Sequence, residues 1–137
     1  MEKRADILII EDDRDIVSSM RIILESRHYQ VREAYDGKQG YAKIEEKMPD
    51  LIILDVMMST ETEGFELAYK LQNTTAYKKI PILMLSSFPK KMVEEGSEKF
   101  QHLLGEHWPV THFLEKPVEP EELLSTVENL IAQPKQT

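Results

Sequence analysis

The sequence predicts a doubly wound α/β fold, in which helices cover both faces of a parallel β-sheet. Five short runs are rich in apolar, often β-branched residues that do not alternate with polar ones in a regular way, as expected for parallel strands that are buried on both faces. Longer segments with a helical spacing of apolar residues separate these runs, and the strand–helix alternation is repeated along the whole chain. The expected strands are Ile7–Ile10, Val31–Tyr35, Leu51–Leu54, Ile82–Leu85 and Thr111–Leu114.

Three amphipathic segments predict the helices that follow the first three strands. Each segment has one apolar face, which is expected to pack against the sheet, and one polar face for the solvent. The residues of the apolar faces are Ile16, Val17, Met20, Ile23 and Leu24 in the first segment, Tyr41, Ile44 and Met48 in the second, and Phe65, Ala68 and Leu71 in the third.

The C-terminal part of the chain predicts two more helices. One is expected within Pro89–Leu104, followed by a loop through Trp108, which either covers the core or anchors a partner protein. The last helix is expected to begin at Pro120, because proline suits the first helical position and two acids follow it in the first turn. Its apolar face contains Leu123, Leu124, Val127, Leu130 and Ile131.

Composition and charge exclude several functional classes. The 137 residues suffice for one domain, which we place at residues 1–132, followed by a polar tail at residues 133–137. The net charge of −8, without a dense basic cluster, argues against direct binding of nucleic acid. The absence of cysteine excludes disulfides and thiolate chemistry. No apolar run is long enough for a membrane span or a signal peptide, so a cytoplasmic location is expected.

Polar residues follow four of the five predicted strands. Glu11-Asp12-Asp13 follows the first strand, Asp55 the third, Ser86 the fourth and Lys116 the fifth. Because the carboxyl ends of parallel strands meet at one edge of a doubly wound sheet, where sites form, we expect these side chains to lie close together.

Each of these residues also has a purely structural interpretation. The acidic triplet can cap a helix, Asp55 can begin a turn, and Ser86 can bond to nearby backbone. Lysines such as Lys116 are mostly solvated. Three converging carboxylates, however, repel one another unless a cation or a raised pKa relieves the repulsion, and Mg²⁺ prefers such oxygen ligands. The group as a whole therefore predicts a hard-cation site with Lys116 as a countercharge.

These residues stand in segments that resemble the receiver domain of two-component response regulators. The resemblance covers nearly the whole chain and implies a flavodoxin-like fold with five helices and the strand order 2-1-3-4-5. The matching segments are Ile7–Asp13, Pro49–Met58, Gly64–Leu67, Pro81–Ser87 and Phe113–Pro117, with Asp36-Gly37 at the turn into the second helix.

The resemblance implies a role for each matching residue. Asp55 is the expected phosphoacceptor, and Lys116 is the lysine that meets the phosphoryl group. Ser86 and Phe113 take the positions of the hydroxyl and the aromatic ring that switch on phosphorylation, and the Lys116–Pro117 bond is a candidate for a cis peptide. The implied Mg²⁺ ligands are Glu11 through water, Asp12, Asp55 and the backbone carbonyl of Met57.

The function that this resemblance implies is phosphorelay signalling by a stand-alone receiver. A sensor histidine kinase or a phosphotransfer protein would donate the phosphoryl group, and the phosphorylated domain would change its binding of a downstream protein. Such a domain is not an enzyme beyond its own phosphorylation and slow autodephosphorylation. We expect a monomer or a weak dimer.

Three departures from the family pattern leave an alternative open. The loop Ser59–Glu63 is longer and more acidic than usual, the segment Phe88–Val110 is extended, and Phe113 lacks the hydroxyl of the commoner tyrosine. The alternative is a pseudo-receiver that binds partners without phosphorylation.

Two other classes are disfavoured by single positions. A phosphatase with an aspartyl nucleophile needs an acid where Met57 stands, two residues after Asp55. An FMN carrier needs a phosphate-binding loop after the first strand, where the acids Glu11, Asp12 and Asp13 would repel the phosphate.

Overall fold

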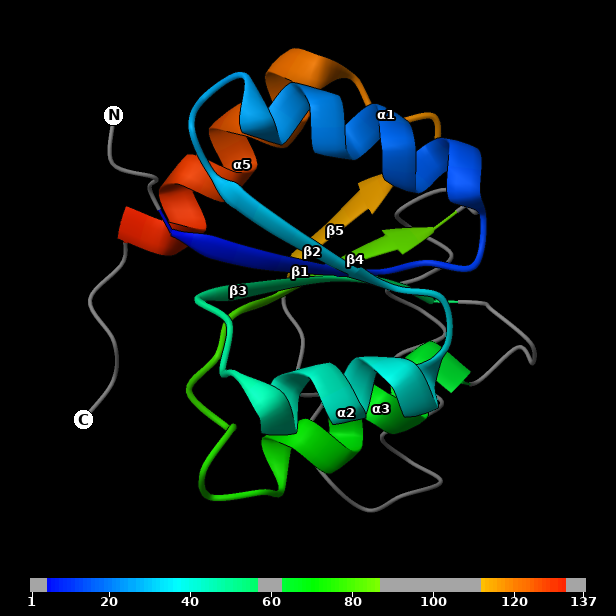
Figure 1. The fold of residues 1–137 in the computed structure, drawn as a ribbon, viewed down its shortest axis with the longest axis vertical. Helices are drawn as coiled ribbons and strands as arrows, with labels where there is room; N and C mark the ends of the chain where they lie inside the picture. The colour runs from blue at the N-terminus through cyan, green and yellow to red at the C-terminus, as the bar shows by residue number, and fades with distance from the viewer. Residues whose placement is uncertain (1–4, 57–62, 87–111, 133–137) are drawn as a thin grey trace.

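The computed structural model describes residues 5–56, 63–86 and 112–132, which form a parallel sheet with helices on both faces (Figure 1). The sheet has the strand order β2-β1-β3-β4-β5, so the predicted fold class and topology are confirmed. In chain order the elements are β1 (Asp6–Ile10), α1 (Arg14–Glu25), β2 (Gln30–Ala34), α2 (Gly37–Glu46), β3 (Leu51–Asp55), α3 (Glu63–Gln72), β4 (Ile82–Ser86), β5 (His112–Glu115) and α5 (Pro120–Ala132).

Four expectations fall wholly or partly outside the described residues. They are the helix within Pro89–Leu104 together with Trp108, the Met57 ligand, the polar tail at residues 133–137, and the loop Ser59–Glu63, of which only Glu63 is described. The division into a domain at residues 1–132 and a tail therefore stays a prediction.

Two apolar clusters sandwich the sheet, because successive residues of a strand point to opposite faces. On one face, Ile7 and Ile9 of β1 pack with α1 and α5. On the other face, Leu8 and Ile10 pack with α2 and α3, which lie together below the sheet in Figure 1. All five residues of β1, β3 and β4 are buried, which explains why these strands are recognisable as continuous apolar runs.

The helix boundaries agree with the sequence except at the end of α2. Met48 was expected on its apolar face, but α2 ends at Glu46 and the Met48 side chain is 51% exposed. Lys47 adopts an extended conformation, and Pro49 restricts the residue before it to extended backbone, so the helix cannot continue through Met48. In contrast, α5 begins at Pro120, as predicted.

Side-chain caps determine where α1 and α2 begin. Asp13 precedes α1, and its carboxylate accepts hydrogen bonds from the backbone N–H groups of Asp15 and Ile16. Asp36 precedes α2 and accepts a bond from the Gln39 N–H. Each cap satisfies donors that the first helical turn leaves unpaired. Within the acidic triplet after β1, Asp13 thus has the structural role, which leaves Glu11 and Asp12 for another one.

A charged pair closes the end of the sheet opposite the predicted site. The Arg32 guanidinium lies 2.8 Å from the Asp6 carboxylate and also donates to the carbonyls of Lys43 and Lys47 at the end of α2.

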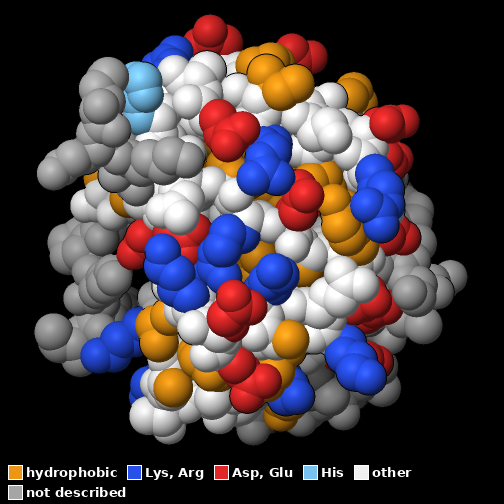
Figure 2. Space-filling model, in the orientation of Figure 1, with side chains coloured by type: hydrophobic (Ala, Val, Ile, Leu, Met, Phe, Trp, Pro, Cys, Tyr) orange, Lys and Arg blue, Asp and Glu red, His pale blue; other side chains and the backbone are white. Residues whose placement is uncertain are grey.

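The face shown in Figure 2 carries lysine and arginine side chains interleaved with acidic ones. In the described part of the chain, no helix is both long enough and apolar enough to cross a membrane.

Candidate functional site

The sheet topology brings three acidic residues together at the carboxyl ends of β1 and β3. Glu11 and Asp12 follow β1, and Asp55 is the last residue of β3, which pairs directly with β1. One carboxylate oxygen from each residue lies within 4.8 Å of the others. Glu11 and Asp55 are buried, whereas Asp12 is exposed. The cluster is therefore open to solvent on the Asp12 side and enclosed by protein on the other.

The Lys116 side chain extends into this cluster from the end of β5. Its ammonium nitrogen lies 2.6 Å from Oε1 of Glu11 and 3.2 Å from Oδ1 of Asp55. All three side chains are largely shielded from solvent, with an exposed fraction of 15% for Lys116 and 5% or less for the acids. Because shielding strengthens Coulombic interactions, this single cation offsets much of the repulsion between the two buried carboxylates.

Backbone hydrogen bonds fix the strand ends that carry these side chains. The Val56 N–H donates to the Leu85 carbonyl, and the Lys116 N–H donates to the Ser86 carbonyl over 2.7 Å. Ser86 is buried and is the last residue of β4, between the strands of Asp55 and Lys116. The Lys116–Pro117 peptide bond is cis. The sheet thus gathers acid, hydroxyl and ammonium groups at one edge.

The electrostatics of the cluster depend on the protonation of Glu11. Burial, together with the nearby Asp55 carboxylate, raises the pKa of Glu11 to about 8, although the Lys116 ammonium opposes the shift. Burial lowers the pKa of Lys116, but its hydrogen bond to Glu11 and the negative charge of Asp55 outweigh this effect, so that the pKa is raised overall. Lys116 is therefore positively charged at neutral pH, and a cation bound at this cluster would favour the charged form of Glu11.

The donor atoms fit a hard divalent cation. Oε2 of Glu11 is buried and has no hydrogen-bond partner, an arrangement that costs free energy unless something binds there. The three side chains that converge here offer only carboxylate oxygens, which suit Mg²⁺ or Ca²⁺ rather than softer metals. The cluster of Glu11, Asp12 and Asp55 can thus hold a metal ion. Met57, whose carbonyl was expected as a further ligand, lies outside the described residues.

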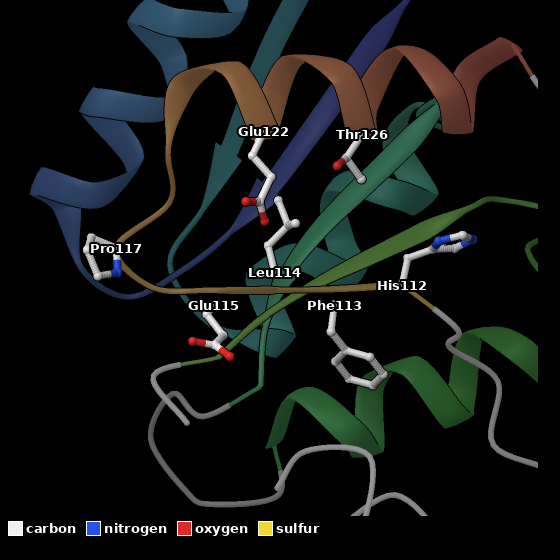
Figure 3. A pocket seen from close by; sticks show the side chains of 7 residues that line it. All are labelled: His112, Phe113, Leu114, Glu115, Pro117, Glu122 and Thr126. Atoms are coloured by element: carbon white, nitrogen blue, oxygen red, sulfur yellow. The ribbon is translucent and has the colours of Figure 1, made fainter. Parts of the chain in front are cut away.

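The predicted switch aromatic, Phe113, lies near the start of β5, three residues before Lys116. Phe113 is buried in the apolar cluster on the α2 and α3 side of the sheet. Figure 3 shows its ring on the opposite side of β5 from Leu114. A pocket of about 560 Å³ lies beside this strand, lined by His112–Glu115 and by Pro117, Glu122 and Thr126 (Figure 3). This pocket lies between β5 and α5 and does not include the residues of the acidic cluster.

At the start of α3, Gly64 contacts the site without having been predicted as part of it, and its neighbour Glu63 contacts α2. Gly64 packs on the backbone of Asp55 and Val56, and Glu63 bonds to the first residue of α2. The only sequence signal for them was the segment Gly64–Leu67, because contacts between residues distant in sequence leave no local pattern.

Comparison with known proteins matches the chain to one family. The profile of the response regulator receiver domain matches residues 7–128. The response regulator GtcR of Aneurinibacillus migulanus is 32% identical over 122 residues, which cover 89% of this chain and 46% of that protein. The protein PilG of Pseudomonas aeruginosa is 29% identical over 130 residues, which cover 93% of this chain and 90% of PilG.

A solved structure shares the same architecture. The chemotaxis response regulator CheY4 of Vibrio cholerae superposes with a TM-score of 0.78 at 29% identity, over 93% of this chain and 99% of that one. Several curated relatives are longer, and the chain spans about half of their length. The chain belongs to the response regulator receiver domain family, the phosphoacceptor class of two-component signalling.

Proposed function

We propose that Asp55 accepts a phosphoryl group from a phosphohistidine of a sensor histidine kinase or a phosphotransfer protein, with Mg²⁺ as cofactor. The observation that carries this proposal is the position of the Lys116 ammonium, 2.6 Å from Glu11 and 3.2 Å from Asp55, beside a buried carboxylate oxygen that lacks a partner. A carboxylate can attack an anionic phosphorus centre only where positive charge offsets the repulsion between them.

Glu11, Asp12 and Asp55 would hold the metal through carboxylate oxygens, with Met57 as the expected backbone ligand. When bound, Mg²⁺ would supply positive charge shared between the Asp55 carboxylate and the phosphoryl oxygens. Lys116 already lies beside Asp55 and is the residue placed to donate a hydrogen bond to one of these oxygens.

In the proposed transfer, an oxygen of Asp55 forms a bond to phosphorus while the bond between phosphorus and the donor nitrogen breaks. The electron pair of that bond stays on the donor imidazole, and Asp55 becomes an acyl phosphate. The phosphorylated state would end by hydrolysis: water attacks phosphorus, the bond between phosphorus and the Asp55 oxygen breaks, and inorganic phosphate is released.

The phosphoryl group would change the output face through Ser86 and Phe113. The new acceptor oxygens attract the Ser86 hydroxyl at the end of β4. Movement of β4 in turn affects β5, because Met84 pairs with Phe113 and Ser86 with Glu115. The phenyl ring of Phe113 would contribute by packing alone, since it has no hydroxyl. The downstream partner would read this two-state change at β5 and α5.

The alternative of a pseudo-receiver is not favoured, because a domain that only binds partners has no need for buried acids around a lysine. A cytoplasmic location, a monomeric or weakly dimeric state and the absence of direct nucleic-acid binding stay predictions from the sequence.

Chemical trapping tests the assignment of the phosphoacceptor. The protein is incubated with acetyl phosphate and Mg²⁺ and then treated with borohydride, which reduces an acyl phosphate to an alcohol. We expect peptide mapping to find homoserine at position 55. Homoserine at another aspartate would contradict the proposal.

A further inference from the structure

The N-terminus of α3 lies unusually close to the strand that carries Asp55. The Gly64 N–H donates to the Val56 carbonyl over 3.1 Å. A Cβ atom at position 64 would overlap the carbonyl oxygen of Asp55 and would lie 2.6 Å from that of Val56, closer than real Cβ contacts allow. Both oxygens belong to the backbone and cannot rotate away as a side chain could. Only glycine therefore permits α3 to pack here without moving the end of β3.

The residue before Gly64 holds α3 from a second direction. Oε2 of Glu63 accepts a hydrogen bond of 2.7 Å from the Gly37 N–H, at the first residue of α2. This N–H would otherwise be one of the unpaired donors of the α2 N-terminus, where negative charge is favourable. Gly37 leaves room for the carboxylate, since a Cβ at position 37 would lie 3.1 Å from Oε2. The contact joins α2 to α3, which lie beside each other in Figure 1.

The sheet also holds the Asp55 backbone. The Val56 N–H donates to the Leu85 carbonyl over 2.9 Å, and Asp55 pairs with Leu85 in the ladder between β3 and β4. The end of β3 is therefore held by β4 within the sheet and by Gly64 at the start of α3. A displacement of α3 changes where the Asp55 carboxylate stands relative to Lys116 and Asp12.

We propose that Gly64 and Glu63 are positioning residues for Asp55: Gly64 by close packing on its backbone, and Glu63 by fixing the start of α3 to α2. The inference rests on the proposed function of Asp55 as phosphoacceptor. Reacting groups require placement to a fraction of an ångström, and an error of about 1 Å can slow a reaction by about 100-fold. The same placement sets the metal affinity of the cluster.

Gly64→Ala tests the first contact, with Gly40→Ala as a matched control. Gly40 lies in α2, where a Cβ would come within 2.5 Å of the Ile10 side chain, so this variant also overpacks a buried contact but leaves the Asp55 backbone alone. Two quantities are measured on the folded fraction, namely the rate of labelling by acetyl phosphate at saturating Mg²⁺ and the Mg²⁺ dissociation constant from calorimetry. We expect Gly64→Ala to slow labelling by about 10- to 100-fold. Gly40→Ala should lower the melting temperature and leave both quantities within about twofold of wild type.

Glu63→Ala and Glu63→Gln test the contact between Glu63 and the Gly37 N–H. These two variants still test the proposal if Gly64→Ala does not fold. Glutamine keeps an oxygen that can accept from the Gly37 N–H, whereas alanine does not. We expect Glu63→Ala to weaken Mg²⁺ binding by about tenfold, as for other residues that support metal ligands, and Glu63→Gln to restore most of it.

The outcomes separate this inference from the proposed function. Labelling and Mg²⁺ binding at wild-type levels in Gly64→Ala and Glu63→Ala would overturn the positioning roles, even if both variants were less stable. If wild-type protein binds Mg²⁺ but takes no label, the proposed phosphoacceptor function fails. The Mg²⁺ affinities of the variants still decide the positioning roles in that case.

Discussion

The ammonium nitrogen of Lys116 lies 2.6 Å from Oε1 of Glu11, in an ion pair that joins the ends of β5 and β1. Glu11 has no exposed surface, so this contact partly compensates for the burial of its charge. Lys116 also reaches Asp55 over 3.2 Å. One cation thus connects three strands at the edge of the sheet where the phosphoryl group is proposed to bind.

Removal of this cation should destabilise the fold as well as the site. In Lys116→Met, the carboxylates of Glu11 and Asp55 lose the ammonium group that lies 2.6 Å and 3.2 Å from them. Breaking a buried ion pair from one side costs about 3 kcal/mol. We expect a loss of that order in the free energy of unfolding, measured by urea denaturation without divalent ions. The double variant Lys116→Met, Glu11→Gln should recover part of this loss, because no unpaired charge then stays at position 11. If the losses of the two single variants simply add in the double variant, the pairing of Lys116 with Glu11 is contradicted.

The stability of the metal-free protein should fall as the pH rises. The pKa of Glu11 is raised from 4.5 to about 8 in the folded state, so the folded protein binds this proton more tightly than the unfolded chain does. The resulting stabilisation is complete below pH 4.5 and is lost as the pH rises to about 8. Thermal melts in EDTA across this range measure the effect. Glu11→Gln should flatten the dependence, and an unchanged slope in this variant would assign it to other groups.

Asp12 should contribute to metal binding and little to folding. Because its side chain is exposed and its carboxylate belongs to the three-acid cluster, we expect Asp12→Ala to weaken Mg²⁺ binding strongly in a calorimetric titration. The neighbouring acid Asp13 provides the control, since it caps α1 and is not in the cluster. Asp13→Ala should cost about 1 kcal/mol of stability through the lost cap and leave the Mg²⁺ affinity nearly unchanged. If Asp12→Ala and Asp13→Ala weaken Mg²⁺ binding equally, the effect comes from the loss of one negative charge near the site and not from a specific ligand.

The pair of Arg32 and Asp6 should affect stability alone. It lies at the amino end of β1, and the side chains are 18% and 7% exposed. Asp6→Asn should lower the free energy of unfolding by about 3 kcal/mol, because Arg32 then lacks a countercharge. The Mg²⁺ dissociation constant of the folded variant should equal that of wild type. A large change in metal affinity would mean that the two ends of the sheet are coupled.

The fold could be predicted because its three central strands, β1, β3 and β4, are buried on both faces and therefore carry continuous apolar runs. Leu51–Leu54 is such a run, and the structure extends it by one residue to Asp55. The predicted end of α2 was wrong, because the helical spacing up to Met48 was given more weight than Pro49. A proline disfavours helical backbone at the residue before it.

The topology of the sheet predicted that the site residues converge, but it did not predict which acid caps α1 and which is buried in the site. Parallel strands place Glu11, Asp55 and Lys116 at one edge, as the sequence indicated. The sequence offered the acidic triplet as a helix cap without singling out Asp13, and it did not show that Glu11, two residues earlier, is fully buried. The contacts of Glu63 and Gly64 join residues far apart in the chain or depend on a close backbone approach, and only the folded geometry reveals them.

The most direct test of the central claim is the intact mass of the protein after incubation with acetyl phosphate, with and without Mg²⁺, beside the variant Asp55→Asn. The asparagine has nearly the same shape but cannot form an acyl phosphate. We predict a single base-labile phosphoryl group on the wild-type protein, dependent on Mg²⁺ and absent from Asp55→Asn. Equal labelling of the variant, or a wild-type protein that takes no label while it binds Mg²⁺, would contradict the assignment of Asp55 as the phosphoacceptor.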